Sequence, residues 1–262
     1  MAKIGFIGMG NMGGAMLKGL SKIVDTADLM FADANTENAK KVFHETGVMF
    51  ADSNAELASK CKYIVLAVKP VIYPKVLKNI QDIVKPGNVV ISIAPGISIE
   101  QLKLRLGADI RIVRAMPNTP ALVGEGMTGI AYDEKDFSEE EIADIEMIFS
   151  SLGRFMKVDE HLIPVVTAAS GSSPAYVYMF IEAMADSVVR YGMPRNQAYE
   201  FVAQTVLGSA KMVLETGEHP GRLKDNVCSP GGTTIAGVAA LEQNGFRSSI
   251  FAATEACYNK AK

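Results

Sequence analysis

The most constraining feature of the sequence is the segment Gly8-Met9-Gly10-Asn11-Met12-Gly13, which fits the pattern GxGxxG. It directly follows an apolar run at residues 3–7 that is typical of a buried strand, and it opens a helical stretch from Met12 to Ser21. An acidic residue, Asp33, lies 20 residues beyond Gly13, at the end of a second apolar run. This context predicts a dinucleotide-binding βαβ unit. The alternative is a purely structural glycine-rich turn.

Each part of the motif has a physical role in that prediction. Gly8 allows the tight turn, Gly10 lets a pyrophosphate approach the backbone, and Gly13 lets the helix pack on the strand. The N-terminus of the helix supplies free N–H groups and a positive dipole end for the phosphates. We therefore expect cofactor contacts along the whole loop, at Gly8, Met9, Gly10, Asn11, Met12 and Gly13.

The first two-thirds of the chain alternates apolar runs with helical stretches. Such alternation predicts an α/β fold with a doubly wound, mostly parallel sheet of the Rossmann type. The runs predicted as strands lie at residues 3–7, 28–33, 63–67, 89–93 and 111–115, with further edge strands at 127–132 and 154–158. Between the last two we expect a helix that begins with a capping box at Ser138 and Glu141 and is closed by Gly153.

After about Glu160 the pattern changes to long helices, predicted at 175–191, 196–215, 221–228, 233–244 and to the end, with Asn196 as an N-cap. We predict two domains, a dinucleotide-binding domain at 1–160 and an all-α domain at 161–262. The apolar residues of the 196–215 helix spread beyond one face, so it needs burial on several sides. We infer that the helical domain forms an oligomer interface.

Composition excludes several classes of protein. The formal net charge is −3 and the pI is about 5.7, so the chain lacks the basic surface that nucleic acids and anionic membranes attract. No apolar run is long enough to span a membrane. The three cysteines form no CxxC pair, which argues against a disulfide scaffold. We expect a soluble cytoplasmic protein.

Three tight turns follow the later strands and would line a ligand at the sheet's carboxyl edge. They are Ala67-Val68-Lys69-Pro70, residues 92–96 and residues 116–120. Lys69 is either a cofactor contact or an ordinary solvated lysine; its position at a strand end favours the contact.

The helical half carries the segment Ser229-Pro230-Gly231-Gly232-Thr233-Thr234 between two predicted helices. We expect a threonine to cap the second helix, whose backbone N–H groups and hydroxyls would hold a small carboxylate. A sharp turn between helices is the alternative. The three histidines are scattered without metal-ligand spacing, so we assign no metal.

The chain resembles the pyrroline-5-carboxylate reductase family, whose members catalyse the last step of proline biosynthesis, essentially from end to end. The matching segments are GFIGMGNMG (5–13), AVKP (67–70), RAMPNTPALV (114–123), SGSSPAYVYMFIEAMADS (170–187) and GSAKMVLETGEHPGRLKDNVCSPGGTTIAGV (208–238). The stretch from Leu223 to Leu241, which contains SPGGTT, is the family's signature.

The resemblance implies an interlocked helical dimer, which some members extend to decamers. It implies cofactor contacts at Gly8 to Gly13, Asp33, Asn54, Ala67 to Lys69 with the adjoining Pro70, Ala94 and Asn226. It implies substrate contacts at Glu160, Thr233 and Thr234, with Ser229, Pro230, Gly231 and Gly232 around them. Thr233 departs from an alanine of some relatives, which matters little if its backbone N–H binds.

The implied reaction is hydride transfer from NADPH or NADH to the cyclic imine 1-pyrroline-5-carboxylate, giving L-proline. Since a basic imine needs little acid catalysis, positioning supplies most of the acceleration. We expect the Thr234 hydroxyl to be the hydrogen-bond partner of the ring nitrogen. A β-hydroxyacid dehydrogenase would need a lysine near Ser170–Tyr176, where none occurs, and a non-catalytic nicotinamide sensor would not need SPGGTT.

Asp33 bears on which of the two cofactors, NADH or NADPH, is preferred. A carboxylate here accepts hydrogen bonds from the ribose hydroxyls of NADH and repels the 2′-phosphate of NADPH. No basic residue follows until Lys40. We therefore expect NADH to be used at least as efficiently as NADPH. The alternatives are an Asp33 that turns outward, or a Lys40 and Lys41 that reach in to the phosphate.

Overall fold

The computed structural model describes residues 3–262, and contacts divide them into two compact units. One unit consists of residues 3–172 together with 257–262, and the other of residues 173–256. The predicted division lay at 160/161, whereas the contacts change between Ser172 and Ser173. The reason is that the helical turns just after residue 160 still pack on the sheet.

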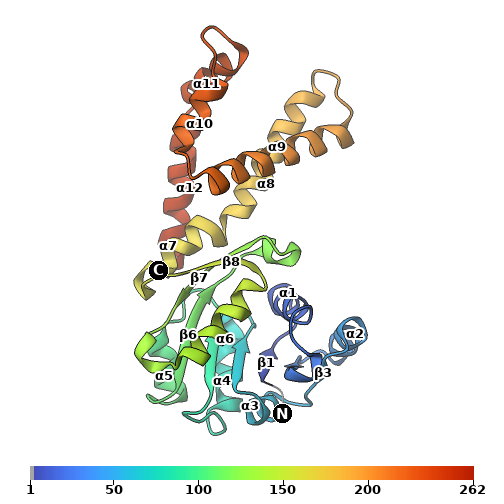
Figure 1. Cartoon of the computed structure of the whole chain (residues 1–262), viewed down its shortest axis with the longest axis vertical. Helices are drawn as coiled ribbons and strands as arrows, with labels where there is room; N and C mark the ends of the chain where they lie inside the picture. Colours follow the sequence, from blue (N-terminus) through green and yellow to red (C-terminus); the bar gives the residue numbers. More distant parts are fainter. Residues whose placement is uncertain (1–2) are drawn as a thin grey trace. The chain divides into compact units, whose positions relative to one another are not determined.

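The first unit is built on an eight-stranded sheet (Figure 1) with the strand order β3-β2-β1-β4-β5-β6-β7-β8. The strands are β1 (Ile4–Ile7), β2 (Leu29–Ala32), β3 (Met49–Phe50), β4 (Tyr63–Leu66), β5 (Val89–Ser92), β6 (Arg111–Met116), β7 (Gly126–Ala131) and β8 (Gly153–Lys157). Strands β1 to β6 pair with one another in parallel, β7 is antiparallel to β6, and β8 is parallel to β7. The predicted mostly parallel sheet is confirmed.

The direction of winding reverses between β1 and β4. From β1 the chain adds β2 and β3 on one side, and it then returns to place β4, β5 and β6 on the other. The register sets Ile4 opposite Leu29 on one side and Tyr63 on the other. The loops that leave β1 and β4 therefore start side by side at the carboxyl edge, which is where open α/β sheets bind their ligands.

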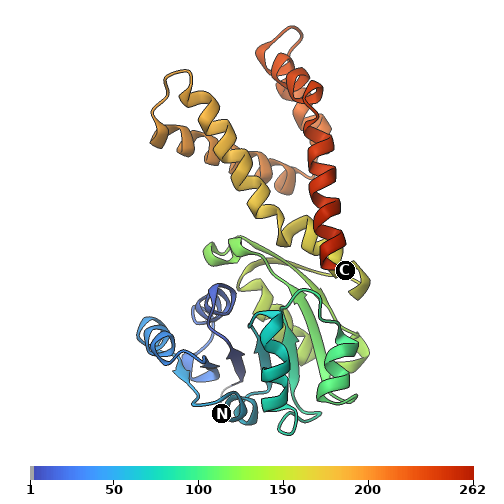
Figure 2. The same cartoon turned by 180° about the vertical axis from the view of Figure 1, so that it is seen from behind.

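Helices cover both faces of this sheet (Figure 2). They are α1 (Asn11–Leu20), α2 (Thr36–Thr46), α3 (Asn54–Lys60), α4 (Tyr73–Ile80), α5 (Ile99–Leu106), α6 (Glu139–Ser150) and α7 (Ile163–Val166), with 3-10 turns η1 (Thr26–Asp28), η2 (Pro70–Ile72), η3 (Thr119–Val123), η4 (Glu134–Asp136) and η5 (Glu160–Leu162) and a π-helical turn η6 (Thr167–Gly171). One buried cluster joins Phe6 and Phe31 to α1, α2 and α6, and the other joins Ile7 and Ile64 to α3, α4 and α5. Burial on both faces explains the nearly continuous apolar strands.

The second unit is all helical and has little interior of its own. Its helices are α8 (Ser173–Val189), α9 (Arg195–Thr216), α10 (Pro220–Val227), α11 (Thr233–Gln243) and α12 (Phe246–Ala261), the last of which ends in the first unit. Its cluster of buried apolar residues consists of Ala185, Ala198 and Val202. Large apolar side chains such as Phe201 and Phe251 are 63% and 76% exposed. The helical unit therefore exposes apolar surface that its own small core does not bury, as its sequence pattern indicates.

Within residues 3–262, no helix combines the length and the apolar character that crossing a bilayer requires. The longest helix is α9, with 22 residues, and it carries charged side chains along its length. The apolar surface of the helical unit is therefore distributed over several helices and is not concentrated in one span.

The predicted capping box of α6 is present, since Ser138 accepts a bond from the N–H of Glu141 and the Glu141 side chain accepts one from the N–H of Ser138. Gly153, however, does not close this helix. The helix ends at Ser150, and Gly153 begins β8 with a φ of +128°. Its positive φ thus serves the entry into a strand.

Two other predicted helix caps are wrong. Pro194 and not Asn196 is the N-cap of α9, because the backbone is already helical at Arg195. Gly232 and not a threonine is the N-cap of α11, so that Thr233 is the first residue inside the helix. Neither N-cap provides a side-chain hydrogen bond. A polar residue near a predicted helix start does not fix the first helical residue when proline or glycine sets the backbone just before it.

A buried carboxylate, that of Glu141, joins α6 to the sheet. It accepts hydrogen bonds from the Arg111 guanidinium at 2.5 Å and the Ser138 N–H at 3.1 Å, and it pairs with the Lys62 ammonium at 3.0 Å. Burial alone would raise the pKa of this carboxyl, but the hydrogen bonds from Ser138, Lys62 and Arg111 outweigh burial and hold the pKa at about 2. The charge of Glu141 therefore stabilises the packing of α6.

We expect Glu141→Gln to lower the free energy of unfolding at pH 7 by about 1–3 kcal/mol, because Arg111 and Lys62 lose their counter-charge. A carboxyl whose pKa is depressed stabilises the fold above its ordinary pKa of 4.5 and loses that contribution as the pH falls toward 2. The difference between wild type and variant in urea unfolding, measured at fixed protein concentration, should therefore shrink from pH 7 to pH 3. Glu37→Gln, whose pair with Lys40 is exposed, is the control and should change stability little. An equal difference at both pH values would contradict this role of the charge.

Candidate functional site

The turn from β1 into α1 leaves no freedom at two of its glycines. Gly8 has a φ of +98°, and its N–H donates to the carbonyl of Ala32 at 2.8 Å. A Cβ on Gly13 would overlap the carbonyl oxygen of Gly8. A Cβ on Gly10, by contrast, would have nothing within 4 Å, so this position is open on its outer side. The open space is where a pyrophosphate would approach the backbone, and a side chain there would fill it.

The N-terminus of α1 is left without an internal acceptor. Gly10 is the N-cap and offers no side chain, and no acidic residue lies in the first turn at Asn11, Met12 and Gly13. The Met9 side chain is buried, so only the backbone of Met9 is available to a ligand at this loop. Unsatisfied N–H groups and the positive end of the helix dipole therefore fit the phosphates of a dinucleotide.

Asp33 does not turn outward. One of its oxygens, Oδ2, accepts hydrogen bonds from the Met9 N–H at 2.7 Å and from the Asn38 side-chain amide at 3.1 Å. The other, Oδ1, accepts from the Asn35 N–H at 2.8 Å. Three N–H groups thus hold the carboxylate beside the glycine-rich loop, which excludes the outward alternative. Its remaining acceptor capacity is on Oδ1, since a carboxylate has about four lone-pair sites.

The two lysines of α2 are engaged elsewhere. Lys40 pairs with Glu37 at 3.2 Å and Lys41 pairs with Glu45 at 3.9 Å. Both pairs are exposed and weak, so they do not prevent a lysine from moving. They do mean that no positive charge is already positioned next to Asp33 among these residues.

The loop after β4 lies against the glycine-rich loop. A Cβ on Gly8 would meet the Val68 side chain at 2.6 Å, so Ala67 and Val68 pack directly beside that turn. Lys69 is exposed and, as the N-cap of η2, precedes Pro70. The glycine-rich loop, Asp33 and the Ala67–Pro70 turn are therefore brought together at the switch between β1 and β4.

A buried tyrosine that the sequence analysis did not single out fixes the ends of β4 and β5. The Tyr73 hydroxyl donates to the carbonyl of Leu66 at 2.8 Å and lies 3.0 Å from the Ser92 hydroxyl. Burial raises its pKa to about 12, so it stays a neutral donor. Two other predicted cofactor contacts follow strands at the same edge: Asn54 begins α3 after β3, and Ala94, which is buried, follows β5.

The loop after β6 uses its asparagine internally. The Asn118 amide donates to the carbonyl of Ser170 at 3.1 Å, and its oxygen accepts from the Met127 N–H at 2.9 Å. The side chain thereby ties this loop to β7 and to the π-helical turn η6. It is buried, so any ligand contact of the loop must come from its other residues.

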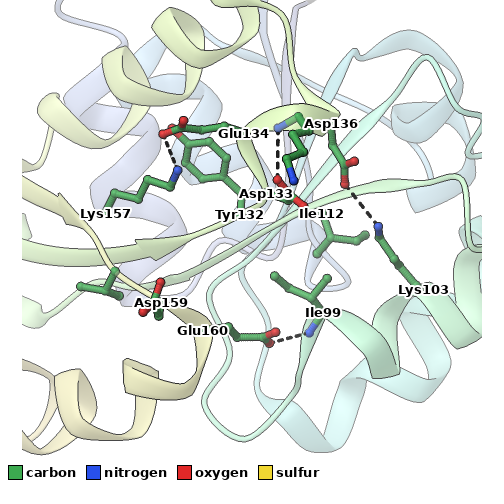
Figure 3. A pocket seen from close by; sticks show the side chains of 12 residues that line it. Ile99, Lys103, Ile112, Tyr132, Asp133, Glu134, Asp136, Lys157, Asp159 and Glu160 are labelled. Carbon is green, nitrogen blue, oxygen red and sulfur yellow. Dashed lines mark hydrogen bonds and ion pairs between the residues drawn. The ribbon is translucent and has the colours of Figure 1, made fainter.

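Glu160, a predicted substrate contact, belongs to the sheet unit. Its Oε1 accepts hydrogen bonds from the Ile99 N–H at the start of α5 (2.8 Å) and from the Arg114 guanidinium (3.0 Å). It is one of the residues that line a cavity of about 640 Å³ (Figure 3). Two ion pairs lie among the residues that line this cavity, Lys103 with Asp136 and Lys157 with Glu134. Glu160 thus has a structural role of its own, and its substrate role stays a prediction.

The SPGGTT segment forms a tight turn in the helical unit. Gly231 has a φ of +68°, which favours glycine, and a Cβ on Gly232 would lie 2.5 Å from the Ser229 hydroxyl, so a side chain there would force Ser229 to move. Thr233 and Thr234 begin α11, whose first turn has neither a side-chain cap nor an acidic residue. In the part of the chain that the structure describes, the Thr234 hydroxyl has no hydrogen-bond partner. An uncapped helix start with a free hydroxyl fits a small carboxylate and a neighbouring nitrogen.

The remaining site residues of the helical unit lie on both sides of that turn. Asn226 is close to the end of α10, and Pro230 precedes the two glycines. The predicted site residues are therefore divided between the two units, with the glycine-rich loop in one and SPGGTT in the other. Among the His, Cys, Asp and Glu side chains of residues 3–262, no three are grouped so that they could hold a metal ion.

Two family descriptions match the chain. Residues 3–96 match the family "NADP oxidoreductase coenzyme F420-dependent". Residues 160–262 match the family "Pyrroline-5-carboxylate reductase dimerisation". The first match contains β1 to β5 with the glycine-rich loop, and the second contains Glu160 and SPGGTT.

Individual relatives extend the similarity over the full length. The pyrroline-5-carboxylate reductase of Escherichia coli K12 is 48% identical over 99% of this chain and 97% of its own. The structure of a pyrroline-5-carboxylate reductase from Coxiella burnetii matches with a TM-score of 0.91 at 33% identity, over 99% of this chain and 97% of the other. A crystal structure of the Plasmodium falciparum pyrroline carboxylate reductase with NADP bound matches with a TM-score of 0.89 at 37% identity, over 100% and 97%. The chain therefore belongs to the pyrroline-5-carboxylate reductase family.

Proposed function

We propose that this NAD(P)H-dependent reductase converts 1-pyrroline-5-carboxylate to L-proline with the cofactor held at the β1/β4 edge and the substrate at the SPGGTT turn. The observation that carries the proposal is the pair of helix starts, α1 and α11, that follow glycine turns and lack side-chain caps. The direct test is oxidation of NADH or NADPH on addition of pyrroline-5-carboxylate. No oxidation with either cofactor would refute the proposal.

The sheet unit supplies the cofactor contacts in this proposal. The N–H groups of Asn11, Met12 and Gly13 face the pyrophosphate, and Asp33 faces the adenosine ribose. The Ala67–Pro70 turn, Asn54, Ala94 and, from the helical unit, Asn226 complete the set. A bound reduced nicotinamide would supply the hydride that is added to the carbon of the C=N bond, which becomes C5 of proline.

The SPGGTT turn supplies the substrate contacts. The backbone N–H groups of Gly231, Thr233 and Thr234 hold the carboxylate, since Pro230 has no N–H and that of Gly232 donates to the Ser229 carbonyl. Ser229 and Glu160 are the further substrate residues of this proposal. The Thr234 hydroxyl forms a hydrogen bond with the ring nitrogen of the substrate, and this nitrogen carries a proton in the product. A cyclic imine is basic enough to arrive protonated, so this chain needs to orient the ring and exclude water more than it needs to donate a proton.

Thr234→Ala should lower kcat/KM for the imine roughly 5- to 150-fold, the effect of about 1–3 kcal/mol for one lost hydrogen bond, while cofactor affinity stays nearly unchanged. Thr234→Ser keeps the hydroxyl and should recover most of the loss. Thr233→Ala keeps the backbone N–H and should cost far less than Thr234→Ala. Unchanged steady-state kinetics of purified Thr234→Ala would exclude the proposed role.

We further propose that NADH is used at least as efficiently as NADPH. The Asp33 carboxylate is held by three N–H donors, so a 2′-phosphate cannot displace it without breaking hydrogen bonds. A phosphate beside this fixed negative charge is a like-charge contact. The P. falciparum relative with NADP bound is the reason to measure both cofactors in this chain.

Asp33→Ser should shift the ratio of kcat/KM toward NADPH by roughly 5- to 30-fold, since it removes the fixed charge. It should also weaken both cofactors somewhat, because the serine cannot replace all three accepted bonds. The measurement is kcat/KM for each cofactor at a fixed imine concentration. A strong NADPH preference in the wild type would show that Asp33 does not select the cofactor.

Finally, we propose that the helical unit forms a homodimer and that dimers are the building block of any decamer. Its own core is small and its large apolar side chains are exposed, which is the pattern of an obligate interface. The family that matches residues 160–262 is named for dimerisation.

Light scattering at micromolar concentration should give at least twice the 28.1 kDa of one chain. Phe201→Glu, on an exposed apolar position of α9, should lower the assembled fraction because it places a charge in the interface. Leu104→Glu, which is 78% exposed on α5 of the sheet unit, is the matched control and should leave assembly unchanged. A fully active monomer would refute the dimer.

A further inference from the structure

One residue of the glycine-rich loop, Met9, is held through both of its backbone polar groups. Its N–H donates to Asp33 Oδ2 at 2.7 Å, and its carbonyl accepts from the Asn38 side-chain amide at 3.0 Å. The same Asn38 nitrogen donates to Asp33 Oδ2 at 3.1 Å. The three residues therefore form a closed ring of hydrogen bonds that we call the Met9 clamp (Met9, Asp33 and Asn38).

The chain positions Asn38 for this contact through α2. Asn35 caps the helix and accepts hydrogen bonds from the N–H groups of Glu37 and Asn38. The backbone of Asn38 is thereby fixed in the first turn of α2, and its side-chain amide points to the loop that leaves β1. Met9 itself is buried, so packing and hydrogen bonds hold it in the same place.

Only a side-chain amide suits the two contacts of Asn38. Its nitrogen carries two hydrogens, and each is directed to a different acceptor, the Met9 carbonyl and the Asp33 carboxylate. An aspartate at this position would place an acceptor oxygen next to those two acceptors, where a donor is needed. An alanine would leave the Met9 carbonyl without a protein donor.

The loop needs such a restraint, because Met9 is flanked by glycines. Gly8 and Gly10 are the residues that lose most conformational freedom on ordering, and Gly10 has open space beside it. The N–H groups proposed to bind phosphate follow directly after Met9. Their direction toward a ligand therefore depends on where Met9 is held.

We propose that Asn38 is a positioning residue that fixes the glycine-rich loop for the pyrophosphate of the cofactor without touching the cofactor itself. This rests on the proposed function, in which that loop binds NAD(P)H. The N–H groups of Met9 and Asn35 still hold Asp33 when Asn38 is lost, so its charge stays in place. Because the pyrophosphate is common to NADH and NADPH, the loss of Asn38 then affects both cofactors by the same factor. That separates Asn38 from Asp33, whose charge distinguishes between them.

The test is to measure dissociation constants of NADH and NADPH by nicotinamide fluorescence, together with full steady-state kinetics, for the full-length Asn38→Ala protein. Both dissociation constants should rise roughly 5- to 20-fold and by equal factors, the effect expected of one or two lost hydrogen bonds. At saturating cofactor, kcat and the KM for the imine should stay within about twofold of wild type. Asn38→Asp should weaken both cofactors more than Asn38→Ala, because it adds a carboxylate beside Asp33.

Asn88→Ala is the matched control. The Asn88 amide also ties two loops, since it donates to the Cys61 carbonyl at 2.8 Å and accepts from the Lys85 N–H at 2.8 Å. It lies next to β5 at the amino edge of the sheet, where no cofactor residue is proposed. Its loss should lower the melting temperature about as much as the loss of Asn38 and leave cofactor binding unchanged.

Unchanged dissociation constants in Asn38→Ala, or a change confined to one cofactor, would overturn the proposal. So would an equal loss of cofactor affinity in Asn88→Ala, because the effect would then follow general stability. If Asn38→Ala does not fold, Asn38→Ser takes its place as the variant that lacks the amide. Cofactor affinities of a folded Asn38→Ser equal to those of the wild type would then contradict the proposal. Asn38→Gln, which retains both amide hydrogens, is the conservative comparison. Failure of the proposed function is distinct from all of these, since the wild type would then bind neither cofactor.

Discussion

The carbonyl oxygen of Gly8 stands where a side chain on Gly13 would have to begin, and this crowding fixes how α1 leaves β1. The helix begins one residue after Gly10, so its N-terminus is held at the carboxyl edge of the sheet. The strand order then places β2 on one side of β1 and β4 on the other, which brings Asp33 and the Ala67–Pro70 turn to the same point. Most of the proposed cofactor site therefore follows from one turn that excludes side chains.

Capping distinguishes the helices of this sheet. The helices α2, α3, α5 and α6 begin with Asn35, Ser53, Ser98 and Ser138, and each of these side chains accepts a backbone N–H. No side chain caps α1 after β1, or the turn η2 that leads into α4 after β4. Both strands of the switch point are thus followed by uncapped starts, where unsatisfied donors are useful to a ligand. The starts of η3, η5 and α7 in this unit also lack a side-chain cap, but they do not follow these two strands.

Local patterns in the sequence predict the parts of the fold that depend on neighbouring residues. Apolar runs located the parallel strands, and Ser138 with Glu141 located the start of α6. The helix ends at Gly153 and Asn196 were wrong, because the true ends depend on the backbone of adjacent residues. The contacts of Tyr73 with Ser92, of Asn118 with Ser170 and of Asn38 with Met9 join residues 19, 52 and 29 positions apart, for which a single sequence carries no local signal. The antiparallel direction of β7 depends on how the chain turns after β6. The sequence therefore predicts the loops of the candidate site, but it does not predict the hydrogen bonds that hold these loops in place.

The helical unit shows the opposite balance between sequence and structure. Its helices follow the sequence pattern closely, yet its buried apolar cluster is limited to three small or medium side chains among the residues described. Burial of so little surface does not offset the conformational entropy of ordering five helices. The missing burial has to come from outside the unit, and exposed residues such as Phe201, Leu214 and Phe251 are the surface available for it. Since SPGGTT lies between two of these helices, the order of this turn, the proposed substrate site, depends on the same burial. In the proposed homodimer, association is therefore a condition for ordering that turn as well as for stability.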